Sequence, residues 1–374
     1  MLKTINLLYK VFKKIKYIKY PRKESDYFDY FIKWVAEEDE FEKYWCENGV
    51  NLSGTLIKFI EQDFLSKVST RSVSSSEKVL EFRELVVEGR YTSNQLFLLY
   101  KGLTVLGCFK LSGVVREIVE EKISKSMFKR YFYPDLGGEN NILTLLDRKY
   151  QSGRYKGKKI AIIGPSESKY NYEELLDFDL LVILGYQELS KFKNLSKVVY
   201  LNDSVIDRDD SWYQLYSKDS IDIVFKGNNR ENFLISKYVS EKNGRFLVDI
   251  NLQWWGVPNL LQVALLDIFF HGGRDVFIYN CNFYLSKDTF SKDYKLKPLG
   301  FTDLGAGTDF YNLFKVFAGH DPYSQIEVTK SLGKVMKIDG DNLFTQAISC
   351  NSDKYLDSLE KAFLNRMLKL PICT

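Results

Sequence analysis

Two patterns of hydrophobic and polar positions divide the chain. From Glu24 to about Tyr155, apolar residues mostly recur at the three- and four-residue spacing of amphipathic helices. From about Lys156 onward, short β-branched apolar runs that end at turns alternate with helical stretches. This alternation is typical of a parallel sheet covered by helices. We therefore predict an α-helical domain over residues 24–155 and an α/β, Rossmann-like nucleotide-binding domain over residues 156–374.

The patterns also predict the individual elements. Amphipathic helices are expected over residues 28–45, 53–68, 77–89 and 93–123. Buried parallel strands are expected in the segments KKIAIIG (158–164), LLVILG (180–185), KVVYLND (197–203), IDIVFKG (221–227) and DVFIYNCNF (275–283). A further helix is expected over residues 259–273, where two glycines provide its C-terminal cap.

The first 23 residues form a separate segment, in which eight Lys or Arg residues occur and no acidic residue. Ile5, Leu8, Phe12 and Ile15 recur at helical spacing, opposite a lysine-rich side. Such a helix lies in the headgroup layer of an anionic membrane or packs on a domain with its lysines in water, and both interpretations stay open.

Composition narrows the class of protein. A net charge of +4 on 374 residues does not indicate nucleic-acid binding. Five cysteines without CxxC spacing fit reduced thiols in a cytoplasm, and no apolar run has the length of a membrane-spanning helix. We expect a cytoplasmic protein, peripheral on the inner face of the membrane if residues 1–23 bind there.

Candidate chemistry lies directly after the predicted strands, because ligands of such sheets bind at the carboxyl ends of strands. The turn Gly164–Ser168 allows backbone N–H groups to approach a phosphate or ribose. Asn202 follows a later strand, and Asn280, Asn282 and Tyr284 follow another. Together these residues predict a nucleotide pocket, whereas each one taken singly also fits an ordinary turn.

His320 is one of two histidines and precedes a predicted helix with Asp321 as N-cap and Pro322 as first residue. The positive end of a helix dipole favours neutral imidazole, which can accept a proton from a hydroxyl group. A loop histidine that binds a nearby carbonyl is the alternative. We interpret His271, at the end of the helix over residues 259–273, as structural.

Three Asp-x-Asp pairs could suggest a metal site: Asp177–Asp179, Asp207–Asp209 and Asp339–Asp341. The first pair precedes a strand instead of following one, and the other two lie in segments expected to be turns. We interpret all three as structural, and Asp339–Asp341 is the pair that best keeps a metal-dependent alternative open.

Five segments in this order resemble bacterial sialyltransferases of glycosyltransferase family 42. They are IIGPSES (162–168), LDFDLLVIL (176–184), VVYLNDS (198–204), residues 254–284 and AGHDPYSQIEVTKSL (318–332). The family has G-P-S-L, D-F-D, Y-N-P-S-like, D-F-Y and G-H-S segments at these places. The resemblance covers about residues 156–334. The order and spacing of the five segments are the evidence for it.

The resemblance implies a role for each matching residue. Gly164, Pro165 and Ser166 would line the nucleotide turn, and Asn202 would contact the CMP moiety. Gly256 and Pro258 would lie near the donor sugar. Tyr284 would bind the departing phosphate, and His320 would be the catalytic base.

The chain also departs from the family pattern. Asn282 stands where the family has aspartate. The family's second phosphate-binding tyrosine falls near Phe290, so Tyr294 is the substitute that we expect. The asparagines that the family has in the glycine turn and after the second strand are replaced by Ile163 and by Leu184 or Gly185. These departures leave the identity of the donor sugar open.

The resemblance implies a sialyltransferase-like variant of the GT-A fold and an inverting, metal-independent glycosyltransferase without a cofactor. It would move sialic acid, a related nonulosonic acid or Kdo from a CMP donor to an oligosaccharide or lipid-linked acceptor of a surface glycan. Residues 285–318 could form a lid over the donor. The alternatives are a metal-dependent transferase using a nucleoside-diphosphate sugar, or a non-catalytic Rossmann-like module in surface-glycan assembly.

Overall fold

A computed structural model describes residues 53–122, 153–166, 172–185, 192, 195–202, 216, 221–226, 244–247, 259–285 and 320–367. The chain divides into two compact units. The helical unit comprises residues 1–123, 304–315 and 363–374, and the sheet unit comprises residues 124–303 and 316–362. The basic segment 1–23, the helix expected over 28–45 and the lid expected over 285–318, apart from its first residue, lie outside the described residues.

Four helices of the helical unit occupy the segments where helical periodicity was expected: α4 (Gly54–Thr70), α5 (Ser76–Glu88), α6 (Ser93–Val105) and α7 (Phe109–Lys122). Ser53, Ser75 and Thr92 cap the first three, each with a side-chain oxygen that accepts a backbone N–H of the first turn. The segment 93–123 forms two helices because the chain turns at Gly107, whose φ of 70° suits glycine.

A buried ionic group on α4 binds the segment that leads to α5. The Asp63 carboxylate accepts a hydrogen bond from Ser74 Oγ at 2.8 Å and pairs with Lys67 Nζ at 3.3 Å. Both charged side chains are almost fully buried, so each carries the desolvation cost that the pairing offsets.

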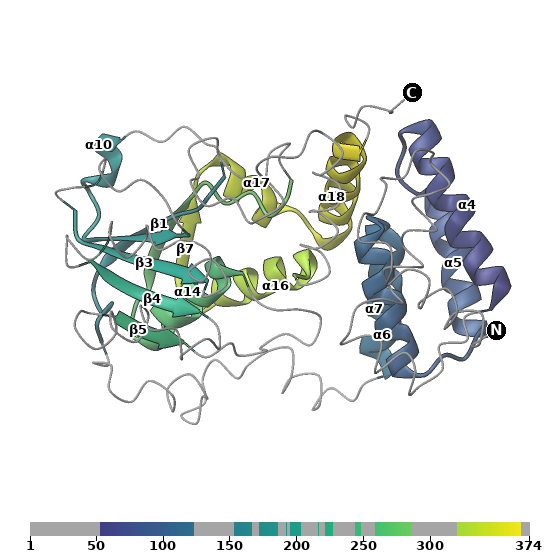
Figure 1. The fold of residues 1–374 in the computed structure, drawn as a ribbon, viewed down its shortest axis with the longest axis horizontal. Helices are drawn as coiled ribbons and strands as arrows, with labels where there is room; N and C mark the ends of the chain where they lie inside the picture. The colour runs from purple at the N-terminus through teal and green to yellow at the C-terminus, as the bar shows by residue number, and fades with distance from the viewer. Residues whose placement is uncertain are drawn as a thin grey trace, which may run out of the picture. The chain divides into compact units, whose positions relative to one another are not determined.

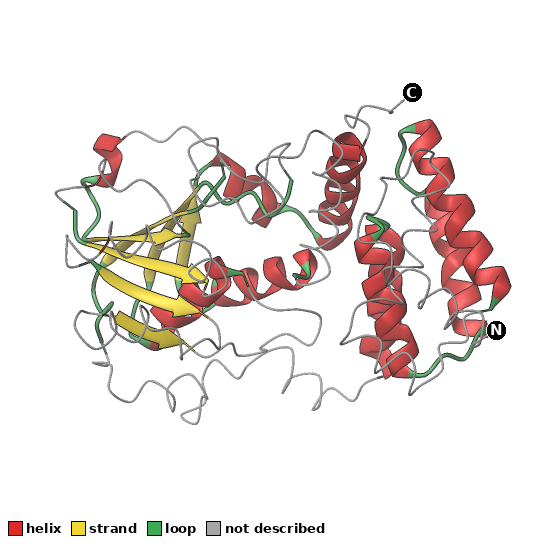
Figure 2. Ribbon diagram, viewed as in Figure 1, coloured by secondary structure: helices red, strands yellow, loops and turns green. Residues whose placement is uncertain are grey.

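Seven parallel strands form the sheet of the second unit, in the order β5-β4-β3-β2-β1-β6-β7 (Figures 1 and 2). Their bounds are β1 (Lys159–Ile163), β2 (Leu180–Leu184), β3 (Lys197–Asn202), β4 (Asp222–Lys226), β5 (Gly244–Leu247), β6 (Asp275–Tyr279) and β7 (Lys337–Gly340). All five predicted strands are present, and the Rossmann-like α/β fold is confirmed.

Two strands, β5 and β7, were not predicted. The sequence of β5 is only GRFL, and the arginine interrupts the apolar pattern that would predict a buried strand. The sequence of β7 is KIDG, an outer strand whose residues alternate between exposed and half-buried. The expectation that Asp339 lies in a turn is therefore wrong. The strand was missed because a half-buried edge strand needs no continuous apolar run in its sequence.

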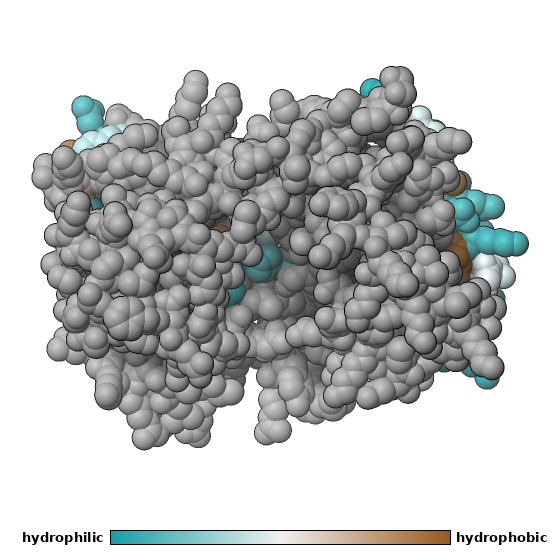
Figure 3. Space-filling model, in the orientation of Figure 1, coloured by the Kyte–Doolittle hydropathy of each residue, from teal (hydrophilic) through white to brown (hydrophobic). Residues whose placement is uncertain are grey.

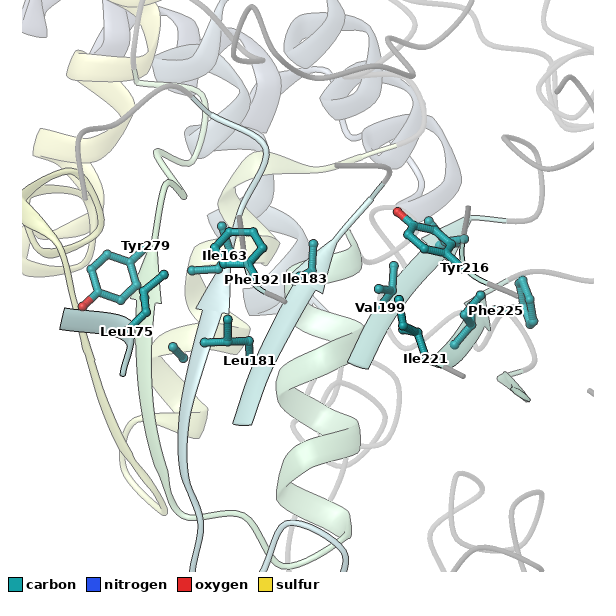
Figure 4. Packing of buried hydrophobic residues seen from close by; sticks show 13 residues of the cluster. Ile163, Leu175, Leu181, Ile183, Phe192, Val199, Tyr216, Ile221, Phe225 and Tyr279 are labelled. Atoms are coloured by element: carbon teal, nitrogen blue, oxygen red, sulfur yellow. The ribbon is translucent and has the colours of Figure 1, made fainter. Parts of the chain in front are cut away.

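One face of the sheet is covered by an apolar cluster. Ile163, Ile183, Val199 and Phe225 belong to it, and Figure 4 shows these side chains along the strands. The residues between them, such as Tyr200, point to the opposite face, where α14 (Leu260–Phe270) contacts β2 and β3. Burial on two faces explains why these strands are apolar throughout.

The other described helices of the sheet unit are α10 (Tyr172–Leu175), α16 (Pro322–Leu332), α17 (Asn342–Ser349) and α18 (Ser352–Met367). The part of α18 from Phe363 onward belongs to the helical unit. The helix α16 packs against α14, and α17 packs against β6 and β7.

The described surface is mixed in polarity. Figure 3 shows hydrophobic residues beside hydrophilic ones where Figure 1 draws α4 and α5. Leu80 and Val87 of α5 are exposed. None of the described helices is both long and apolar enough to span a lipid bilayer.

Candidate functional site

The order of the strands creates one switch point in the sheet. The chain builds outward from β1 through β2 to β5 on one side, whereas β6 and β7 lie on the other side of β1. At such a point the loops after two neighbouring strands diverge and leave a crevice, which is the general ligand site of open α/β sheets. The turn after β1 and the loop after β6 are therefore the first places to inspect.

The turn Gly164–Ser166 lies directly against the loop Asn280–Tyr284. Gly164 N donates to Tyr279 O at 2.8 Å, and Ser166 N donates to Asn280 O at 3.1 Å. A Cβ atom on Gly164 would overlap the carbonyl oxygen of Asn280 and Sγ of Cys281. Glycine is thus required here by the close approach of two backbones.

The loop after β6 holds three non-glycine residues in the left-handed region. Asn280, Phe283 and Tyr284 have φ values of 60°, 47° and 67°. Such conformations cost about 1–3 kcal/mol each and gather at functional sites. The surroundings compensate, because Asp341 Oδ2 accepts from Asn280 N at 2.7 Å and Asn282 Oδ1 accepts from Tyr284 N at 2.9 Å.

Tyr284 is joined to the beginning of α14. Its hydroxyl oxygen accepts a hydrogen bond from Asn259 Nδ2 at 2.7 Å. Asn259 is the N-cap of α14, but its side chain makes no capping bond. The N-terminus of α14 therefore presents first-turn N–H groups that the N-cap side chain leaves uncapped, close to a tyrosine hydroxyl.

His320 is half-buried and stands one residue before the N-cap of α16. Asp321 and Pro322 have the expected positions: Asp321 Oδ2 accepts from Ser324 N at 3.0 Å, and Pro322 begins the helix. The Asp321 carboxylate already accepts a hydrogen bond from the first turn of α16. The N-terminus of α14 is therefore the better binding site for a phosphate group. Gln325 of α16 links the two helices, since its Oε1 accepts from Asn259 N at 3.0 Å.

Other predicted site residues have different positions. Asn202 is the last residue of β3, where it pairs in register with Lys226, and β2 separates it from β1. The Asn282 side chain is buried and stabilises its own loop. Gly256, Pro258 and Tyr294 lie outside the described residues.

In the Asp-x-Asp pairs that the structure describes, three carboxylates have partners within the sheet unit. Asp179 Oδ2 accepts from Lys159 N at 2.8 Å. Asp341 uses both oxygens, one for Asn280 N and one, at 2.9 Å, for Phe344 N in the first turn of α17. Asp339 is an exposed partner of Lys337. Among the described residues, no group of three or more His, Cys, Asp or Glu side chains is placed to hold a metal ion.

Carboxylates lie on both sides of the switch point. Burial raises the pKa of the Tyr279 hydroxyl, and the carboxylates of Glu174, Asp341 and Asp177 raise it further. Tyr279 belongs to the apolar cluster, on the face opposite α14. On the α14 side the Asp321 carboxylate lies at the start of α16, and the N-terminus of α14 is the feature that favours an anionic ligand.

A second polar cluster, not predicted as a group, lies between α14 and the sheet. We call Tyr155, Tyr200, Arg245, Asp267 and His271 the Asp267 cluster. Arg245 Nη1 donates to Asp267 Oδ1 at 2.9 Å, and Arg245 Nη2 and the Tyr200 hydroxyl donate to Asp267 Oδ2. The Tyr155 and Tyr200 hydroxyl groups are 3.1 Å apart, and His271 Nδ1 lies 2.8 Å from Asp267 O and 3.1 Å from Asp267 Oδ1.

Ionisation in this cluster is strongly biased. Burial by itself raises the pKa of Asp267, but Arg245 and His271 lower it well below the ordinary 3.8. Burial also opposes a charge on His271, yet its hydrogen bond to Asp267 and the Asp267 charge raise its pKa above 6.5. Burial and Asp267 raise the pKa of both tyrosines, so they stay neutral donors.

The cluster fastens α14 to the sheet away from the strand ends. Tyr200 and Arg245 are in register through Val224 on the face that α14 covers. A single aspartate within the apolar sequence LLQVALLDIFF was the available signal. The structural interpretation of His271 agrees with its place at the C-cap of α14.

The switch-point site is thus a glycine turn, a strained loop, the start of α14 and the start of α16, joined by hydrogen bonds. On the α14 side its described groups include N–H and O–H donors, which are the kind of group that favours an anion, and His320 lies in one of the joined segments. No protein-family model, no curated protein and no solved structure matches the chain.

Proposed function

We propose that the protein is an inverting, metal-independent glycosyltransferase that moves a 2-keto sugar acid from a CMP donor to a glycan acceptor. One observation carries the proposal. The turn Gly164–Ser166 and the strained loop Asn280–Tyr284 meet at the switch point, and Asn259 and Gln325 connect them to the helix that follows His320. Ligand-binding and base-bearing segments are thereby joined in one network.

The type of donor follows from the groups that the site provides. CMP departs as a phosphate monoester, which carries less charge than a nucleoside diphosphate. The Tyr284 hydroxyl and the N-terminus of α14 supply directed donors for that charge without a metal ion.

In the proposed reaction, His320 is the proton acceptor. An acceptor hydroxyl oxygen attacks the anomeric carbon while the bond from that carbon to the phosphate oxygen breaks. CMP leaves with the electron pair of that bond, and the hydroxyl proton passes to the imidazole of His320. Direct displacement from the opposite side inverts the anomeric configuration.

The location and the acceptor belong to the same proposal. A surface glycan assembled on the cytoplasmic side of a membrane supplies an oligosaccharide or lipid-linked acceptor. The basic residues 1–23 would keep the enzyme beside such an acceptor by their attraction to anionic headgroups.

The test is thermal unfolding of the full chain with CMP, CDP, UDP or GDP. CMP at 100 times its dissociation constant should stabilise the protein by about 2.7 kcal/mol. Tyr284→Phe should weaken this effect because it removes the hydroxyl group. Tyr91→Phe, which loses a hydroxyl bonded to Ser53 in the helical unit, should leave it unchanged.

His320→Ala separates binding from chemistry. The variant should keep the stabilisation by CMP and lose about 10²-fold in turnover. Stabilisation by UDP or GDP alone would contradict a CMP donor, and full turnover in His320→Ala would contradict the assigned base.

A further inference from the structure

Tyr355 of α18 contacts two parts of the switch-point site, the loop Asn280–Tyr284 and the start of α16. Its side chain is fully buried. The hydroxyl group donates to Phe283 O at 3.0 Å and lies 3.4 Å from Pro322 O. Phe283 belongs to the strained loop that presents Tyr284, and Pro322 is the first residue of α16, two residues after His320.

The hydroxyl group of Tyr355 is a permanent donor. Burial raises its pKa well above the ordinary 10.0, and the neighbouring Tyr284, Asp321 and Cys350 raise it further. The same neighbours place the ring among groups of both halves of the site. A protonated phenol satisfies a buried loop carbonyl, which would otherwise lose its hydrogen bonds with water.

With Tyr355, the hydrogen bonds around the site form a closed ring. On one side, Tyr284 is bonded to Asn259, and Asn259 is bonded to Gln325 of α16. On the other side, Tyr355 directs its single hydroxyl proton at Phe283 O and shares it with the more distant Pro322 O, so one three-centre hydrogen bond joins the loop to the start of the same helix. Two separate links between the loop and α16 fix their spacing, whereas one link would act as a hinge.

We infer that Tyr355 is a positioning residue that sets the spacing between Tyr284 and His320. The inference rests on the proposed function, in which Tyr284 binds the leaving phosphate and His320 accepts the proton. Tyr355 acts through Phe283, which precedes Tyr284, and through Pro322, which follows His320 by two residues. It holds the strained conformation of Phe283 and the first turn of α16 in one arrangement.

The experiment is amide hydrogen exchange on Tyr355→Phe, which keeps the aromatic ring. Without ligand, exchange should become about tenfold faster at Tyr284 and Leu285 in the loop and at Ser324 and Gln325 in α16, since about 1.4 kcal/mol of restraint is lost. The matched control is Tyr155→Phe, which removes another buried hydroxyl of the sheet unit. It should leave exchange at all four amides unchanged.

A second variant opens the ring at its other link. Asn259→Ala should have a modest effect alone, because Tyr355 still joins the loop to α16. The double variant with Tyr355→Phe should exceed the sum of the two single effects, because the second change then removes the remaining link of the ring. Additive effects, or faster exchange on one side only, would overturn the inference.

CMP as a probe distinguishes this inference from the proposed function. In the unmodified protein CMP should protect both segments, and in Tyr355→Phe it should protect only the loop 280–285. Absence of protection in the unmodified protein would contradict the proposed function alone, because the ring is tested by the ligand-free exchange.

Discussion

The Asp267 cluster and the switch-point site are two polar regions of one sheet unit, and they are built in opposite ways. The cluster is ionic and buried, and none of its five residues has a positive φ value. At the switch point the described donors toward the α14 face are a neutral hydroxyl and backbone N–H groups, and the backbone takes left-handed conformations. Strong charge and backbone strain are thus found in different places.

The difference shows which signal indicates function here. Strongly shifted pKa values are often used to locate active sites, but in this unit they do not separate the two regions. Asp267 and the two tyrosines bonded to it have large shifts, and so do Cys281 and Tyr355 at the switch point. Position at the strand ends, together with strain, identifies the better candidate site.

The largest expected effect comes from removing the cation of the Asp267 cluster. Arg245→Met leaves Asp267 as a buried charge without its main partner, so the free energy of unfolding should fall by about 3–5 kcal/mol. Chemical denaturation of the full chain measures this loss. Arg83→Met is the control: it breaks an exposed pair with Glu117 and Glu121 and should cost less than about 1 kcal/mol. Similar losses in both variants would remove the distinction between the two kinds of ion pair.

A smaller effect on stability, but a larger one on binding, is expected from Gly164→Ala. The added methyl group overlaps Asn280 O and Cys281 Sγ, which should cost about 1–3 kcal/mol and displace the loop of Tyr284. Stabilisation by CMP should then be lost. Gly54→Ala meets no atom within 4 Å and should change stability by less than about 0.5 kcal/mol. Unchanged CMP binding in Gly164→Ala would show that the switch point is not the nucleotide site.

The smallest effect is a dependence on pH. The pKa of His271 is raised in the folded protein above its ordinary 6.5, so its contribution is fully present below that value and lost as the pH rises through the folded pKa. Asp267 stays charged over this range because its pKa is lowered. The stability difference between the unmodified protein and His271→Gln should therefore be largest near pH 5.5 and decrease toward pH 9. A difference that is constant with pH would exclude this linkage.

Much of the sheet was predictable, because strands buried on both faces leave continuous β-branched runs such as IAII and LLVIL. β5 and β7 were not, since Arg245 is neutralised by a distant residue and β7 lies at an edge. For the site, strand ends correctly indicated that Gly164–Ser166 and Asn280–Tyr284 meet. Asn259, Gln325 and Tyr355 could not be found, because their contacts join residues far apart in the chain and leave no local pattern.

The pairing of β1 with β6 has a consequence for folding. Lys159 of β1 pairs with Asp275 of β6, and β2 to β5 lie between these two strands in the sequence. Pairing over such a sequence distance is slow, because the entropy of closing the intervening chain is lost before any contact forms. A ligand of the crevice is therefore expected to bind after β1 and β6 have paired, and so to slow unfolding more than it speeds folding.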